Sequence, residues 1–116
     1  MLSEATYSVR RHQEPKPGQS RTVRFEGRDH GSQVSMFLVD NEPGQGPGLH
    51  MHPYSETWVV RKGEAEFTVG AARTRAYPGD IVVAAPNVPH RFENVGSGRL
   101  EVLCIHANDH IVQTFI

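Results

Sequence analysis

Short β-prone runs divided by turn residues make up most of this chain, and no stretch has the apolar period of an amphipathic helix. Pro and Gly mark the divisions, as at Pro17-Gly18, Pro43-Gly44, Pro78-Gly79 and Gly96-Ser97-Gly98. Short strands spaced about 8–12 residues apart are typical of a β-sandwich or barrel. The pattern predicts strands over Thr6–Arg11, Thr22–Glu26, Val34–Val39, Leu49–His52, Glu56–Arg61, Glu64–Val69, Arg73–Tyr77, Asp80–Ala84, Arg91–Val95, Leu100–His106 and Ile111–Ile116.

Length and composition narrow the class of protein. A chain of 116 residues is expected to form one domain, residues 1–116, with strands and a loop in its N-terminal part, residues 1–33. The net charge of −1 and the lack of a basic stripe argue against nucleic acid as a partner. Cys104 is the only cysteine, so a disulfide framework and a cysteine-based zinc site are excluded within one chain. We find no signal peptide and no apolar run of about 20 residues, and therefore expect a cytoplasmic protein without a membrane partner.

The chain has seven histidines, and two of them form a His-x-His pair with a nearby glutamate. Side chains alternate faces along a strand, so His50 and His52 point the same way, with Cα atoms about 6.6 Å apart. Two imidazoles at that separation can bind one metal ion. Pro53 cannot donate to a sheet ladder and is expected to end the strand. A short connection can then fold Glu56 back beside His52.

A fourth candidate ligand, His90, lies at the start of a later strand. Pro86 and Pro89 flank Asn87-Val88 and stiffen the approach to it. Three imidazoles and one carboxylate form an N3O set that suits one divalent ion of Fe, Mn, Co, Ni or Zn. In six-coordinate geometry this set leaves two positions for water, substrate or dioxygen.

The spacing of these residues resembles the cupin family. In the first cupin motif, residues 44–63, Gly44 is followed after five residues by His50, and His52, Glu56 and Gly63 also fall at the family's positions. In the second motif, residues 79–94, Gly79, His90 and Asn94 match the family's spacing. The family's proline and glycine are replaced by Ala85 and Asn87. Asn tolerates a left-handed turn conformation better than other non-glycine residues, so the departure concerns the shape of the turn rather than the ligand.

The resemblance implies an all-β fold, a jelly-roll-like antiparallel β-barrel of a single domain, with the metal at its mouth and often a homodimer. It also implies that His50, His52, Glu56 and His90 bind the metal and that Glu56 doubles as a proton acceptor. Cupins include dioxygenases, isomerases, lyases, cyclases and decarboxylases as well as proteins that only bind small molecules. The fold therefore does not choose the reaction.

Four further residues are candidates for a substrate pocket, each with a structural alternative. Trp58 and Phe92 share strand parity with the ligands and either line the pocket or, as we favour, pack in the core. Tyr54 either gates the mouth or is a half-exposed turn aromatic. His106 is either a base near the metal or a satisfied core histidine, and core packing is the preferred interpretation.

We therefore expect a metalloenzyme acting on a small organic molecule. Within that class a quercetinase-like dioxygenase is favoured, because aromatic residues around the mouth would suit a flat ligand. The alternatives are a redox-free cupin enzyme, such as a sugar isomerase, lyase or cyclase, and a non-catalytic cupin that binds a small molecule.

Overall fold

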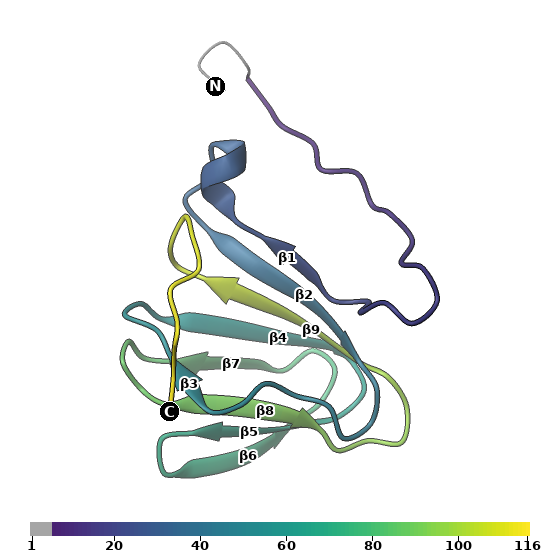
Figure 1. Ribbon diagram of the computed structural model, residues 1–116. Coiled ribbons are helices and arrows are strands. Elements are labelled where there is room, and N and C mark those ends of the chain that lie inside the picture. The colour runs from purple at the N-terminus through teal and green to yellow at the C-terminus, as the bar shows by residue number, and fades with distance from the viewer. Residues whose placement is uncertain (1–5) are drawn as a thin grey trace.

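A computed structural model describes residues 6–116, and in this range two five-stranded antiparallel sheets face each other (Figure 1). The first sheet has the order β1-β2-β9-β4-β7, with strands Val23–Phe25, Ser35–Asn41, Leu100–His106, Glu56–Lys62 and Ile81–Ala84. The second has the order β10-β3-β8-β5-β6, with strands Thr114–Phe115, His50–Met51, His90–Asn94, Ala65–Val69 and Ala72–Ala76. A short 3-10 helix, η1, spans Gly27–His30. The all-β expectation is confirmed.

Side chains that point between the sheets form layers set by the strand register. The pairings place Ser35, His106, Glu56 and Ala84 in one layer of the first sheet. The next layer holds Phe37, Cys104, Trp58 and Val82, and the third holds Val39, Val102 and Val60. Alternate residues of β4 and β9 are buried, as the period of two along a strand requires. The core therefore grades from a polar layer at one end to aromatic and then aliphatic layers.

Two predicted strands differ from the structure, and both lie near the chain ends. Thr6–Arg11 is not a strand: it is exposed along its length and pairs with no neighbour. Its two apolar residues, Tyr7 and Val9, remain 79% and 51% exposed, and the segment does not add to the sheet beside its edge strand β1. Within Ile111–Ile116 only Thr114–Phe115 forms a strand, β10, while the preceding residues cross from one sheet to the other. No helix in residues 6–116 is long and apolar enough to cross a membrane.

Candidate metal centre

The first cupin motif delivers its three candidate ligands from a strand, a turn and a second strand. His50 lies in β3, and its Cα is paired with that of His90 in β8. The strand ends after Met51, and β4 begins at Glu56, so the chain turns over Pro53 as the sequence predicted. Glu56 therefore approaches the histidines from the opposite sheet.

The second motif is tied to the first through its turn. Asn87 has φ 63°, the only positive φ of a non-glycine residue in the described part of the chain. Its backbone N–H donates to the carbonyl oxygen of His52 at 2.7 Å. Asn87 thus takes the left-handed conformation for which the family uses glycine, and the turn still brings His90 beside the first motif.

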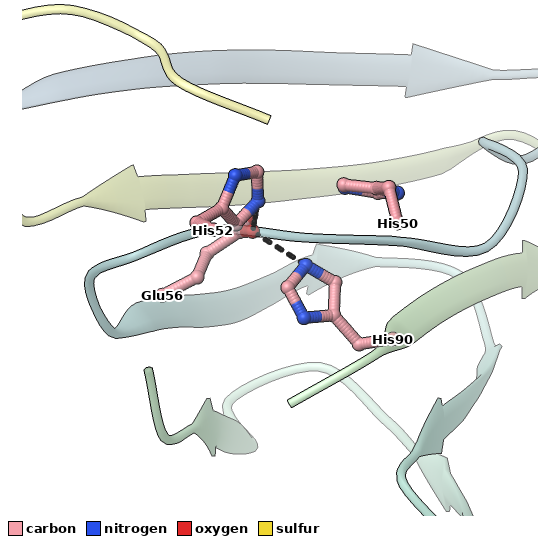
Figure 2. A group of neighbouring side chains, drawn as sticks. All are labelled: His50, His52, Glu56 and His90. Atoms are coloured by element: carbon pink, nitrogen blue, oxygen red, sulfur yellow. Dashed lines mark hydrogen bonds and ion pairs between the residues drawn. The ribbon is translucent and has the colours of Figure 1, made fainter. Parts of the chain in front are cut away.

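Four buried side chains converge between the sheets, namely those of His50, His52, Glu56 and His90 (Figure 2). One potential ligand atom from each lies within 4.8 Å of the others. Glu56 Oε1 is 2.9 Å from His52 Nε2 and 3.1 Å from His90 Nε2. These are the four residues that the sequence nominated.

Hydrogen bonds fix which nitrogen of each imidazole faces the centre. The Nδ1 atoms of His50, His52 and His90 lie 2.7, 2.8 and 3.0 Å from the carbonyl oxygens of Gly48, Val112 and Val88. A carbonyl only accepts, so each Nδ1 carries the proton, and in a neutral imidazole Nε2 then has a free lone pair. When the imidazoles are neutral, three such lone pairs and a carboxylate can face one metal ion in this buried space. Nε2 of His52 is hydrogen-bonded to Glu56 Oε1, whereas Nε2 of His90 has no partner of hydrogen-bond geometry. This donor set fits a divalent metal ion, with backbone carbonyls as the outer partners of its ligands.

His106 is oriented differently from these three histidines. Its Nδ1 lies 2.7 Å from the Tyr54 hydroxyl, which also accepts from the backbone N–H of Val112 at 3.2 Å. The hydroxyl proton can then be donated to Nδ1, which leaves the proton of His106 on Nε2. That Nε2 is 3.3 Å from Glu56 Oε2, the oxygen turned away from the other histidines. His106 therefore holds Glu56 in place rather than adding a fourth nitrogen ligand.

Burial and hydrogen bonding pull in opposite directions on the ionisable groups. Burial alone would raise the pKa of Glu56, but the contacts from His106, His52 and His90 outweigh it and hold that pKa well below its ordinary range. Burial lowers the pKa of His50 and raises that of Tyr54. The charge states that result are an ionised carboxylate, a neutral imidazole and an un-ionised phenol, which suit metal ligation and hydrogen bonding by these groups.

The pocket candidates separate into two pairs. Trp58 is fully buried, with its ring 4.9 Å from that of His90 and 5.1 Å from that of Phe67, so it belongs to the core beneath the site. Tyr54 stacks on His52 at 5.0 Å between ring centroids. By contrast, Phe92 and His106 line a cavity next to the candidate ligands. His106 is buried, as expected, but its contacts are with Tyr54 and Glu56 rather than with core residues alone.

A cavity of about 1080 Å³ opens beside the candidate ligands. His50 and Glu56 reach it, and its apolar side is formed by Phe37, Val39, Phe92 and Phe115. The segment from Pro15 to Thr22 contributes to the wall. Sequence reasoning missed Phe37 and Phe115. Their strands pair with β9 and β3, and only this register reveals that they face the site.

The comparisons with known proteins were made on the sequence and on the fold. The family model described as Cupin domain matches residues 37–106, well over half of the chain. An oxalate decarboxylase of Bacillus subtilis is 36% identical over 83 residues, which are 66% of this chain and 22% of that protein. A mannose-1-phosphate guanylyltransferase of Escherichia coli is 25% identical over 89 residues, which are 76% of this chain and 18% of that protein. The chain thus spans about a fifth of each of these two relatives.

Solved structures agree with the family match. A conserved protein of Klebsiella pneumoniae with a double-stranded β-helix domain has 26% identity and a TM-score of 0.69, covering 87% of each chain. An oxalate decarboxylase of Bacillus subtilis studied for its Mn(II) centres has 26% identity and a TM-score of 0.77, covering 90% of this chain and 30% of the other. An oxalate oxidase, at 20% identity and a TM-score of 0.76, shows the fold alone. By family match, fold and motif positions, this chain belongs to the cupin family.

Proposed function

We propose that this protein is a divalent-metal-dependent enzyme that acts on a small, flat organic molecule, and that its reaction is of the quercetinase-like dioxygenase type. The observation that carries the proposal is the position of the cavity. It is open to His50 and Glu56, yet Phe37, Phe92 and Phe115 supply much of its apolar wall. Ligand sites commonly combine an apolar, aromatic lining with a few polar groups that fix orientation.

Each part of the site has a role in this reaction. His50, His52, Glu56 and His90 would hold the metal, which would supply a Lewis acid at the cavity wall. The three phenylalanines would orient a planar substrate by stacking and would exclude water. Glu56 is the proton acceptor within reach, and His106 controls the direction in which its carboxylate points.

The first experiment is elemental analysis of the purified protein beside a His50→Ala/His52→Ala double variant. We expect about one equivalent of metal in the wild type, as for a single-ion site, and none in the variant. His12→Ala is the matched control, because that histidine is exposed on the N-terminal segment and its side chain hydrogen-bonds to Glu14. Absence of metal from both proteins, even after reconstitution with Mn, Fe, Co, Ni or Zn, would contradict the proposal.

The second experiment measures oxygen uptake by the metal-loaded protein with flavonols, diketones and catechols. Uptake that requires the intact ligand set supports the dioxygenase type. Lack of uptake with the whole panel overturns it. Conversion of a substrate by the Zn(II)-loaded protein in the absence of oxygen would instead favour a redox-free isomerase, lyase or cyclase.

A second candidate substrate is oxalate or a similar small carboxylate. It is favoured by the 36% identity to the oxalate decarboxylase over 83 residues. Two of the three cations on the cavity wall do not favour it, because Arg21 and Arg99 both pair with Asp40; Lys16 is the third. Carbon dioxide release from oxalate by the Mn-loaded protein would establish this candidate.

A further inference from the structure

Two of the candidate ligands, His52 and Glu56, are connected by a chain of contacts that runs behind the metal centre. It starts at His52 Nδ1, which donates to the carbonyl oxygen of Val112 at 2.8 Å. The backbone N–H of Val112 donates to the Tyr54 hydroxyl at 3.2 Å, and that hydroxyl lies 2.7 Å from His106 Nδ1. His106 Nε2 is 3.3 Å from Glu56 Oε2. Because Glu56 Oε1 is 2.9 Å from His52 Nε2 (Figure 2), the contacts close into a ring, and we call these five residues the ligand ring.

Donation runs in one direction around the ligand ring. The backbone N–H of Val112 can only donate, so the Tyr54 hydroxyl accepts from it. The hydroxyl proton is then left to donate to His106 Nδ1, and the remaining proton of His106 points at Glu56. Hydrogen bonds aligned in this way polarise one another, so a change at one link alters the others. Within the ring only Tyr54 accepts and donates through the same atom, so loss of its hydroxyl breaks two links at once.

Burial makes a broken link in the ligand ring costly. His52, Glu56 and His106 are only 1%, 3% and 1% exposed. Tyr54 is half-buried and closes the ring on its outer side, with its aromatic ring parallel to that of His52. Without the hydroxyl, His106 Nδ1 would be a buried acceptor that lacks its present partner, which is unfavourable. The imidazole can relieve this by turning about its Cβ–Cγ bond, and its Nε2 then leaves Glu56.

The backbone of Val112 can support two links because its segment is fixed by residues outside the ligand ring. Val112 lies between β9 and β10, in the stretch that crosses from one sheet to the other. The preceding residue, Ile111, donates its backbone N–H to Glu26 Oε2 at 2.9 Å. The backbone N–H of Arg28 donates to the carbonyl oxygen of Asp109 at 2.8 Å. The crossing segment is thus tied to the first sheet and to η1, and it presents the N–H and carbonyl of Val112 at fixed positions.

We propose that Tyr54 is a positioning residue of the metal centre, whose hydroxyl couples His52 to Glu56. The hydrogen-bond partners of the hydroxyl are His106 and Val112, so it acts on the two ligands indirectly. A bound ion would replace the contact between His52 and Glu56, in which both atoms are potential ligands, and the other four links would remain. The inference rests on the metal centre of the proposed function but not on its substrate or its reaction.

Titration calorimetry of the full chain with Mn(II), over four variants, tests the proposal. Tyr54→Phe removes only the hydroxyl and keeps the aromatic ring that stacks on His52. We expect its metal affinity to be about tenfold below that of the wild type, the lower end for a residue that orients a ligand, with unchanged stoichiometry. In a His106→Phe background, the added Tyr54→Phe change should lower the affinity no further, because the hydroxyl acts through His106. Tyr77→Phe, at a 49% exposed tyrosine outside the ligand ring, is the matched control and should bind metal as the wild type does.

The visible absorption of the Co(II)-loaded protein provides a readout that loss of stability alone would not change. It depends on the placement of the ligands, so we expect Tyr54→Phe to shift it while the far-ultraviolet spectrum stays the same. A Tyr54→Phe variant with the Mn(II) affinity and the Co(II) spectrum of the wild type would overturn the proposal. So would losses that add in the double variant, because Tyr54 would then act independently of His106. Both outcomes leave the proposed function standing, whereas a wild type that binds neither metal would overturn it together with this inference.

Discussion

The two ends of the barrel interior are built by the same strands but hold opposite chemistry. At one end, Glu56 and His106 form a buried polar layer with the other candidate ligands. Two residues after Glu56 in β4 and four residues before His106 in β9, the same faces carry Trp58 and Val102. The alternation of inward and outward side chains is unbroken between the two ends, so the backbone conformation does not distinguish them. What differs is the free energy of burial, which is favourable for the apolar end and costly for an unpaired polar end.

This difference predicts that stability and metal binding can be separated by mutation. The apolar end should determine the free energy of unfolding, because it removes apolar surface from water. The polar end should contribute little to the stability of the metal-free protein. Its hydrogen bonds mainly compensate for the loss of water around buried groups.

The largest expected effect on stability is at the apolar end. Trp58 is fully buried and contacts Phe67, and Trp58→Ala leaves a cavity that the layers above and below cannot fill. We expect a loss of about 3–5 kcal/mol in the free energy of unfolding, measured by urea denaturation of the metal-free protein. Phe115→Ala, at a 61% exposed position, is the control and should cost far less. A small loss for Trp58→Ala would contradict the division between the two ends.

The next largest effect is expected on metal affinity rather than on the free energy of unfolding. His90→Ala removes one lone pair from the candidate set and also the buried Nε2 that has no hydrogen-bond partner. We expect metal affinity to fall by more than the 10–100-fold typical of a residue outside the ligand set, while the urea midpoint of the metal-free protein changes little. Titration calorimetry with Mn(II) and Zn(II) measures the affinity. Equal metal binding by the variant and the wild type would remove His90 from the site.

A smaller effect is expected at His106, which acts on the metal only through Glu56. His106→Phe removes the donor to Glu56 Oε2 and frees the carboxylate to turn. We expect metal affinity about 10–100-fold below that of the wild type, without loss of stoichiometry. His106→Gln can still donate to that oxygen and should recover part of the loss. If the Phe and Gln variants bind metal equally, the hydrogen bond to Glu56 has no positioning role.

The sequence predicts the elements of this fold well because apolar and polar residues alternate regularly along the strands and each strand ends at a turn residue. Leu100–His106 has the predicted bounds, and β4 and β7 are within one residue of theirs. Three of the candidate ligands were also found from local spacing, since His50, His52 and Glu56 lie within seven residues of each other, whereas His90 was nominated by its place at a later strand start and by the second cupin motif. A strand-period argument is enough for contacts of this range.

What the sequence does not predict is the register between strands far apart in the chain. The contact of His106 with Glu56 depends on the pairing of β9 with β4. Likewise, the carbonyl of Val112 that holds His52 is 60 residues away and belongs to the backbone, so no side-chain pattern marks it. The part of the cavity wall formed by Pro15–Thr22 is a further case, because nothing in a polar loop sequence indicates which part of the molecule the loop lies against.

The smallest expected effect comes from charges near the apolar end that stay in contact with solvent. Asp40 accepts hydrogen bonds from Arg21, at 3.0 Å, and from Arg99, and the two arginine side chains are 50% and 33% exposed. Burial raises the pKa of Asp40, but the two arginines outweigh it and hold that pKa below its ordinary value of 3.8.

A carboxyl group whose pKa is lower in the folded than in the unfolded chain stabilises the fold at pH values above its unfolded pKa. This stabilisation is lost as the pH falls through the folded pKa. The wild type should therefore lose more stability than Asp40→Asn as the pH is lowered below about 4. Because solvent screens the pair, the difference should be only about 0.2–1 kcal/mol and should shrink in high salt. Urea midpoints of both proteins, measured across this range at low and high salt, give the comparison. A difference that persists in high salt would show that the charges near the apolar end are desolvated. Both ends would then contain a desolvated charge cluster, and they would differ in ligand geometry rather than in polarity.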